Sequence, residues 1–180
     1  MNYLYKTVTI LAFLVLISFQ GLLARQIVLQ DNFEDEDLTQ NPVWTGDVGD
    51  YTFVQENGNT LLRLNAAAGD RSEISTLSPT AYGSWEFYVR VPATSTQNRV
   101  YVYLMSDSDL LDIIGAGSPG NANGYAIHTG NGNFELVRLN NGNSTSLLNS
   151  NTTITANQGY QVRVSRNQAD EWHLWELNFE

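Results

Sequence analysis

Two stretches of this chain, close together in sequence, alternate apolar and polar residues with the two-residue period of a β-strand. In residues 85–91 and 100–104, every second residue is Trp, Phe, Val or Leu, and the residues between them are Glu, Arg or Tyr. Because successive side chains of a strand point to opposite faces, each stretch has one face suited to a core and one suited to water. The pattern therefore predicts two neighbouring, half-buried strands.

Turn signals recur at short intervals along the rest of the chain. Asn-Gly, which favours tight hairpins because both residues tolerate positive φ, occurs at 57–58, 123–124, 131–132 and 141–142. Residues 107–123, rich in Gly, Ser, Asn and Asp, predict a long surface loop. The sequence predicts an all-β sandwich of two antiparallel sheets. Its ten expected strands are Tyr51 to Gln55, Thr60 to Asn65, Ser72 to Thr76, Trp85 to Val91, Val100 to Ser106, Gly124 to Thr129, Asn133 to Leu139, Thr145 to Leu148, Tyr160 to Arg166 and Glu171 to Leu177.

Residues 1–24 have the features of a secretory signal peptide. Lys6 precedes the apolar run 8–19, and the small residue Ala24 closes a segment of the usual length. A signal anchor is the alternative, because residues 7–24 approach the shortest stretch that spans a bilayer. We expect cleavage instead, since no Lys/Arg cluster follows the run. The sequence thus predicts a secreted or cell-surface domain over residues 25–180, with no membrane insertion after cleavage.

Composition excludes several classes of partner and cofactor. Without the leader, eight arginines face 19 acidic residues, a formal charge of −11, so nucleic acid and anionic membranes are poor ligands. The chain has no cysteine and only two histidines, His128 and His173, which excludes disulfides and an ordinary zinc site. A secreted domain of this kind must be stabilised by its own core.

The polar faces of the two alternating stretches suggest a carbohydrate ligand. A sugar has apolar C–H faces that stack on aromatic rings and hydroxyls that bond to charged groups. If the two strands are neighbours, their polar residues form one surface. A solvated face without a ligand is the equally weighted alternative. The candidate glycan-binding residues are Glu86, Tyr88, Arg90, Arg99, Tyr101 and Tyr103.

Seven segments follow one another along the chain in an order that resembles a known family. They are Asp31 to Thr39, Asn41 to Asp47, Leu62 to Asn65, Trp85 to Val89, Val100 to Asp107, Asn123 to Tyr125 and Val162 to Arg166. This order is similar to that of the N-terminal concanavalin A-like (laminin G-like) sandwich of large secreted Bacteroidetes-type proteins, which often carry lamin-tail and sorting domains. The resemblance covers nearly all of residues 31–177. It implies a concanavalin A-like jelly roll, a recognition or adhesion role, and further strands and downstream domains missing from this chain.

An enzyme of the same fold is the main functional alternative. The carboxylate-rich strand motif of endoglucanases, Glu-x-Asp-x-x-Glu, is absent. Arg71-Ser72-Glu73-Ile74 and Ile127-His128 resemble two strand motifs of alginate lyases, although Ala126 stands where that family has Gln. The resemblance implies Arg71 as the residue that neutralises the uronate carboxylate and His128 as the base of a β-elimination. The non-catalytic interpretation is an Arg71–Glu73 ion pair and a hairpin histidine.

One metal site is conceivable from the sequence. Sandwiches of this class often hold a structural Ca²⁺ near the N-terminal strand, bound by carboxylates and backbone carbonyls. Asp31, Asp35 and Asp37 lie where such ligands are expected. Acidic surface turns are the alternative in a chain this acidic.

Overall fold

The protein is built from β-strands throughout the part of the chain that the structure describes. The computed structural model describes residues 26–67, 72–92, 99–107, 122–130 and 132–179. These ranges contain eleven strands and one 3₁₀ turn, η1 (Val48–Asp50). The strands are β1 (Thr45–Gly46), β2 (Tyr51–Glu56), β3 (Asn59–Leu64), β4 (Ile74–Ser75), β5 (Gly83–Arg90), β6 (Tyr101–Ser106), β7 (Gly124–His128), β8 (Glu135–Asn140), β9 (Asn143–Asn149), β10 (Gly159–Arg166) and β11 (Trp172–Phe179).

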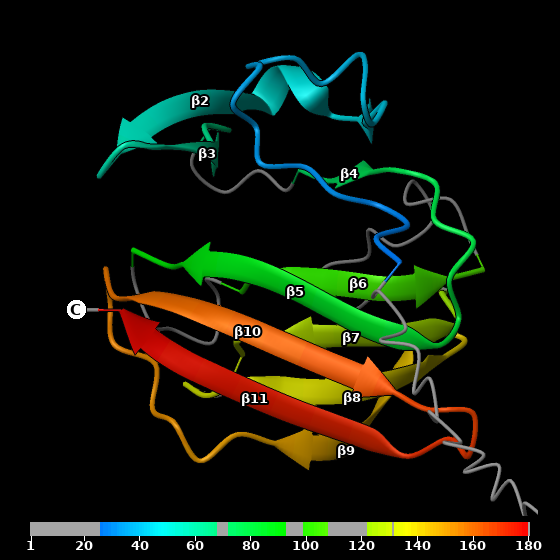
Figure 1. The fold of residues 1–180 in the computed structure, drawn as a ribbon. Helices are drawn as coiled ribbons and strands as arrows, with labels where there is room; N and C mark the ends of the chain where they lie inside the picture. Colours follow the sequence, from blue (N-terminus) through cyan, green and yellow to red (C-terminus); the bar gives the residue numbers. More distant parts are fainter. Residues whose placement is uncertain (1–25, 68–71, 93–98, 108–121, 131, 180) are drawn as a thin grey trace, which may run out of the picture.

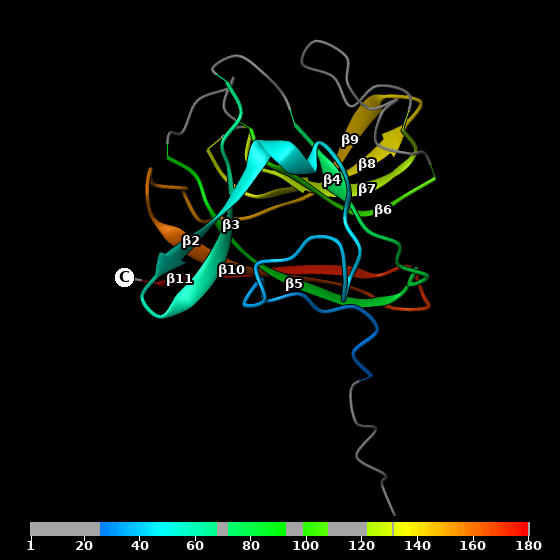
Figure 2. The same cartoon turned by 90° about the horizontal axis from the view of Figure 1, so that it is seen from above.

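The strands form two larger and two smaller sheets, all antiparallel. One larger sheet has the order β11-β10-β5 and the other the order β6-β7-β8-β9, while β1 pairs with β4 and β2 with β3. The two larger sheets lie one over the other, as Figures 1 and 2 show from two directions. This arrangement is consistent with a β-sandwich and confirms the predicted all-β class.

A single main core fills the space between the two larger sheets. Val162 and Val164 of β10 face Ile127 of β7 and Leu136 of β8, and all four are almost fully buried. Tyr160 packs its ring edge-on against Phe134 at 5.3 Å, and its hydroxyl accepts a hydrogen bond from the Thr155 amide at 2.8 Å. Burying each side chain of this size contributes about 1.5–3 kcal/mol, so this core holds the two sheets together.

All ten predicted strands are present, and two of the Asn-Gly turns behave as expected. Asn57-Gly58 joins β2 to β3, and Asn141-Gly142 joins β8 to β9, with positive φ at all four residues. Gly124 does not form a hairpin turn. It is the first residue of β7 and lies beside the bulge in β6. A Cβ on Gly124 would lie 2.1 Å from the Met105 carbonyl oxygen, so glycine is needed there for close approach. The sequence analysis did not predict β1 or η1.

The prediction that the two alternating stretches are neighbouring strands is wrong. β5 pairs with β10, with Trp85 opposite Val164, whereas β6 pairs with β7. The chain therefore crosses from one sheet to the other between Val91 and Val100. The alternation correctly identifies which side chains face the core, because that depends on backbone geometry alone. It does not determine which strand lies alongside, because in a sandwich that partner is often distant in sequence.

Several predicted features lie outside the described residues. These include the leader 1–24, Arg71, Asn131 and positions 108–121 of the predicted loop. The ends of that loop are joined, because the Asn123 amides bond to both carboxylate oxygens of Asp107. Within the described ranges, no helix has the length and apolar character needed to cross a bilayer.

Candidate functional site

The structure divides the six predicted glycan-binding residues between opposite sides of the molecule. Glu86 and Tyr88 alternate with core residues of β5 and so lie on the outer face of the three-stranded sheet, as does Arg90. Tyr101 and Tyr103 lie on the outer face of the four-stranded sheet, and Arg99 directly precedes that strand. The predicted single surface of six residues does not exist, because β5 and β6 belong to different sheets.

The outer face of the three-stranded sheet carries an exposed group of aromatic and charged side chains. The register places Glu86, Arg163 and Trp175 in one row across the three strands, and Tyr88, Gln161 and Leu177 in the next. Trp175 is 47% exposed, Tyr88 43% and Leu177 64%. We call this group the outer platform, and its members are Glu86, Tyr88, Arg163, His173, Trp175 and Leu177.

Contacts within the outer platform orient its charged and aromatic groups. The Arg163 Nε lies 3.3 Å from Glu86 Oε1, and the guanidinium carbon lies 5.4 Å from the centroid of the Trp175 ring. His173 stacks beside Trp175 with 5.4 Å between centroids and 19° between planes. Each of these solvent-exposed contacts contributes only about 0–1 kcal/mol. Their effect is to restrict the orientations of the indole ring.

The Tyr88 ring lies against Gly159 of β10, which has no side chain to displace it. A Cβ on Gly159 would lie 2.3 Å from the Tyr88 hydroxyl oxygen, so the ring occupies the space that any larger residue would fill. Gly159 is buried, although it lies on the solvent-facing side of the sheet, because the Tyr88 ring covers it. Arg90, also on this face, forms an ion pair with Glu56 of β2 and so links the sheet to the β2–β3 hairpin rather than extending the platform.

A groove adjoins the platform where the edge strands β9 and β11 meet. It has a volume of about 250 Å³ and is lined by Leu148, Asn149, Trp172, His173, Leu174 and Trp175. The Asn149 amide nitrogen donates to Ser146 Oγ at 3.1 Å. Among the described residues, the Trp175 indole N–H and the His173 ring form no hydrogen bond with the protein, so both are free for a ligand.

The outer face of the four-stranded sheet is different, because apolar side chains on it are buried. Ala126, Val137 and Leu139 form a second apolar cluster, against which Tyr101 and Tyr103 pack. Burial raises the pKa of Tyr103 well above its ordinary value, with smaller contributions from Tyr101 and Glu73. The two tyrosines are half-buried, so they do not share an exposed face with Glu86 and Tyr88.

His128 on this covered face has both ring nitrogens engaged. Its Nδ1 accepts a hydrogen bond from the Gly130 amide at 2.9 Å, and its Nε2 donates to Glu135 Oε2 at 3.0 Å. The residue is only 6% exposed, and its ring stacks on Tyr101 with 5.2 Å between centroids. Burial lowers the pKa of His128, so the ring is neutral at pH 7. This geometry is that of a hairpin histidine, not of a base with a free nitrogen.

Among the carboxyl groups that the structure describes, Glu73 has the most strongly shifted pKa, whereas the sequence suggested only an ion-pair role for it. Its Oε1 is buried without a hydrogen-bond partner, while its backbone amide donates to Asp47 Oδ2 at 3.1 Å. Burial, and secondarily Asp47, raises the pKa of Glu73 to about 7. The expected partner Arg71 lies outside the described residues, and Ala126, in the position of the lyase Gln, is fully buried.

The three candidate calcium ligands act as acceptors in local turns. Asp31 accepts hydrogen bonds from the Phe33 amide and the Trp44 indole, and Asp35 accepts one from the Asp37 amide. The Thr39 hydroxyl and amide, with Gln40, hold the pKa of the Asp37 carboxyl below its usual range. In the described ranges, no group of three or more metal-ligating side chains is gathered, so these aspartates do not converge on one point.

Sequence reasoning missed Arg163, His173, Trp175 and Leu177. One signal was present: residues 172–177 place large apolar side chains on both faces of the strand, Trp172 and Leu174 on one and Trp175 and Leu177 on the other. No protein-family model matches the chain, and no curated protein matches it significantly.

Proposed function

We propose that this chain is a non-catalytic, extracellular recognition module with a concanavalin A-like jelly-roll sandwich, and that it binds a glycan on the outer platform. The observation that carries the proposal is the pair of exposed rings, Trp175 and Tyr88, on one sheet face that also carries the Arg163–Glu86 ion pair. An exposed aromatic group rimmed by charged residues is typical of a binding surface.

The chemistry of the platform suits a sugar. The C–H face of a pyranose ring stacks on an indole or phenol ring, while its hydroxyls bond to carboxylate and guanidinium groups. The free indole N–H of Trp175 and the adjoining groove offer further contacts at the sheet edge.

The platform is also rigid, which lowers the entropic cost of binding. The strands that carry it are anchored on their opposite face by the fully buried Val162 and Val164. Ring contacts with Arg163 and His173 restrict Trp175, and Gly159 leaves the space that Tyr88 fills. Affinity is gained when a ligand does not have to order the groups that bind it.

Three features support recognition over catalysis, two of them against a lyase and one against a glycoside hydrolase. Both nitrogens of His128 are occupied within the protein, and Ala126 leaves the lyase-like set one donor short. The platform itself carries one carboxylate, Glu86, which is paired with Arg163, whereas glycoside hydrolysis requires two. The extracellular setting and a larger parent protein are supported by the leader-like residues 1–24 and by the resemblance of residues 31–177 to laminin G-like surface modules.

The test is retention of neutral glycans by wild type and by matched variants. Trp175→Ala should weaken retention on an array of β-glucan, xylan and mannan oligosaccharides by about 1–3 kcal/mol through lost stacking. Tyr82→Ala is the control, because Tyr82 is exposed to a similar extent, 48%, but lies outside the platform. Equal losses in both variants would contradict the proposal. Release of an unsaturated, ultraviolet-absorbing product from alginate would instead favour the lyase.

A further inference from the structure

The inner face of the four-stranded sheet continues beyond the core and changes from apolar to polar. Ile127 and Leu136 are paired in the register and buried in the core. The next pair along the same face is Tyr125 and Arg138, directly opposite each other. Tyr125 contacts Trp172, the first residue of β11, with 4.7 Å between ring centroids. This pair therefore lies where the three-stranded sheet ends, and the face beyond it is open.

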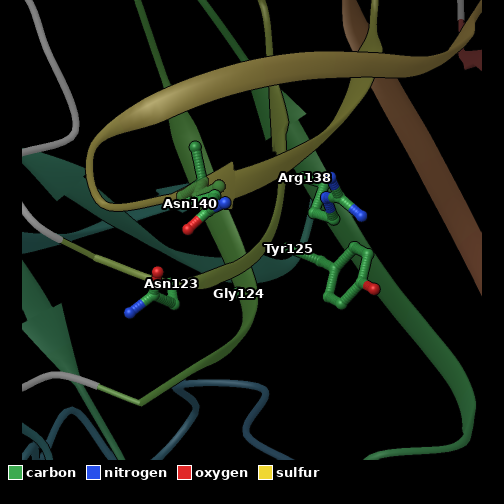
Figure 3. Close-up of a pocket in the computed structure, with 6 residues that line it drawn as sticks. Asn123, Gly124, Tyr125, Arg138 and Asn140 are labelled. Carbon is green, nitrogen blue, oxygen red and sulfur yellow. The ribbon is translucent and has the colours of Figure 1, made fainter.

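A cleft of about 320 Å³ lies at this end of the sheet. It is lined by Asn123, Gly124, Tyr125, Arg138, Leu139 and Asn140, and we call it the Arg138 cleft. In Figure 3 the side chains of Arg138 and Tyr125 extend toward the same side of the view, with Asn140 and Asn123 on the other side. The volume is at the lower end of the range of small-molecule sites, about 300–1,000 Å³, and suits a single sugar unit.

Arg138 is a cation without a partner in this cleft. Arg90, Arg163 and Arg166 each form an ion pair, with Glu56, Glu86 and Asp170 respectively. The Arg138 side chain is exposed and forms no ion pair or hydrogen bond with the described residues. In a chain of net charge −10, an unpaired guanidinium inside a cleft is available to an anionic ligand.

Neutral hydrogen-bonding groups lie beside this cation. The Tyr125 hydroxyl and the Asn140 side-chain amide form no hydrogen bond within the described ranges. The Tyr125 ring is fixed between Trp172 and the Arg166 guanidinium, whose carbon lies 4.9 Å from the ring centroid. The Asn123 side chain, in contrast, is engaged within the protein: its Nδ2 donates to Asp107, and its Oδ1 accepts from the Asn141 backbone amide.

We propose that the Arg138 cleft binds a uronic acid unit of an acidic glycan. The Arg138 guanidinium binds the carboxylate through two parallel hydrogen bonds, and the Tyr125 hydroxyl and the Asn140 side-chain amide form hydrogen bonds with the ring hydroxyls. One unpaired cation matches the single charge of a carboxylate better than the double charge of a phosphate monoester. The site is on a different sheet from the outer platform and does not depend on the function proposed for it.

The experiment is a titration of the ¹⁵N-labelled chain followed by NMR, including the arginine Nε–H signals. The ligands are sodium D-glucuronate, D-glucose and sodium acetate at equal ionic strength. Glucuronate should shift the signals of Arg138, Tyr125 and Asn140 in a saturable way. Glucose should not, and acetate should bind about tenfold more weakly because it lacks the hydroxyls.

Variants assign the binding to the cleft. Arg138→Gln should weaken glucuronate binding about tenfold or more. Arg138→Lys should weaken it less, because lysine keeps the positive charge but cannot form the two parallel hydrogen bonds of a guanidinium. Arg63→Gln is the matched control, because Arg63 is likewise exposed without an ion pair among the described residues, but lies on β3. Equal dissociation constants for glucuronate and acetate would overturn the proposal. So would an unchanged constant in Arg138→Gln, or tighter binding of the dipeptide Ala-Ala, which would indicate a peptide carboxylate site.

Discussion

The outer faces of the two larger sheets are built from the same strand alternation, yet they have opposite properties. On the three-stranded sheet, Trp175 and Leu177 are exposed, and the Trp175 ring contacts His173 and Arg163 of the same face. On the four-stranded sheet, Ala126, Val137 and Leu139 are buried, and the polar residue His128 on the same face is paired with Glu135. A polar strand face can thus be a binding surface or a second core.

The comparison shows that residue type alone does not distinguish the two cases. Tyr101 and Tyr103 look as suitable for stacking on sugars as Tyr88 and Trp175 do. What separates them is burial: desolvation raises the pKa of Tyr103, whereas Tyr88 and Trp175 keep nearly half of their surface in contact with water. Function is therefore expected on the exposed face and stability on the covered one.

The largest expected effect comes from removing the same side chain on each face. Leu139→Ala should destabilise the protein by about 2–5 kcal/mol, because Leu139 is 2% exposed and its loss leaves a cavity. Leu177→Ala, on the outer platform, should change the free energy of unfolding by less than about 0.5 kcal/mol. Urea denaturation of both variants measures the difference. Similar losses would mean that the two faces are not distinct.

The two histidines provide a second matched pair. His128→Ala should cost about 1–3 kcal/mol, because it leaves the Glu135 carboxylate buried without its partner. His173→Ala, on the outer platform, should cost little.

His128 should also make the stability of the protein depend on pH. Burial lowers the folded-state pKa of His128 from its ordinary 6.5, so below that pH the unfolded chain binds a proton that the folded chain does not. Stability should therefore fall as pH drops from 7 to 5, and His128→Ala should remove part of that slope. An unchanged slope in His128→Ala would show that this ring is not buried in its neutral form.

Glu73 should give a smaller effect of the opposite sign. Its pKa is raised from 4.5 to about 7, so the folded state holds a proton that the unfolded state has lost. The stability that this proton provides is present below pH 4.5 and is lost as pH rises to 7. Glu73→Gln should stabilise the protein at pH 8 by about 1 kcal/mol, a figure reduced for solvent screening. Chemical denaturation at pH 4 and pH 8 provides the check, and equal effects at both would contradict the burial of Oε1.

Strand positions could be predicted from the sequence because they depend on local properties. The alternation in 85–91 and the Asn-Gly pairs at 57–58 and 141–142 act over a few residues, and the structure confirms both. Strand neighbours could not be predicted in the same way. β5 pairs with β10, with paired residues that are 69 to 83 positions apart in the chain, and no local pattern encodes that pairing.

The candidate site was predicted in part for the same reason. Glu86 and Tyr88 follow from one strand, but Arg163 and Trp175 join them only through the pairing of β5 with β10 and β11. The hydrogen bonding of the His128 ring could likewise not be predicted from its motif. It depends on the Gly130 amide in the following turn and on Glu135 across the ladder, which together occupy both nitrogens.

The most direct test of the central claim, that the exposed face binds glycan and the covered face does not, follows the four tryptophan indole N–H signals by NMR. The ligands are cellohexaose, xylohexaose, mannohexaose and laminarihexaose, added one at a time. The Trp175 signal should shift and saturate with at least one of them, while the signal of Trp85, which packs against the core and lies outside the groove, stays in place. No shift with any of the four, or shifts confined to the amides of Tyr101, Ala126 and His128, would contradict the account.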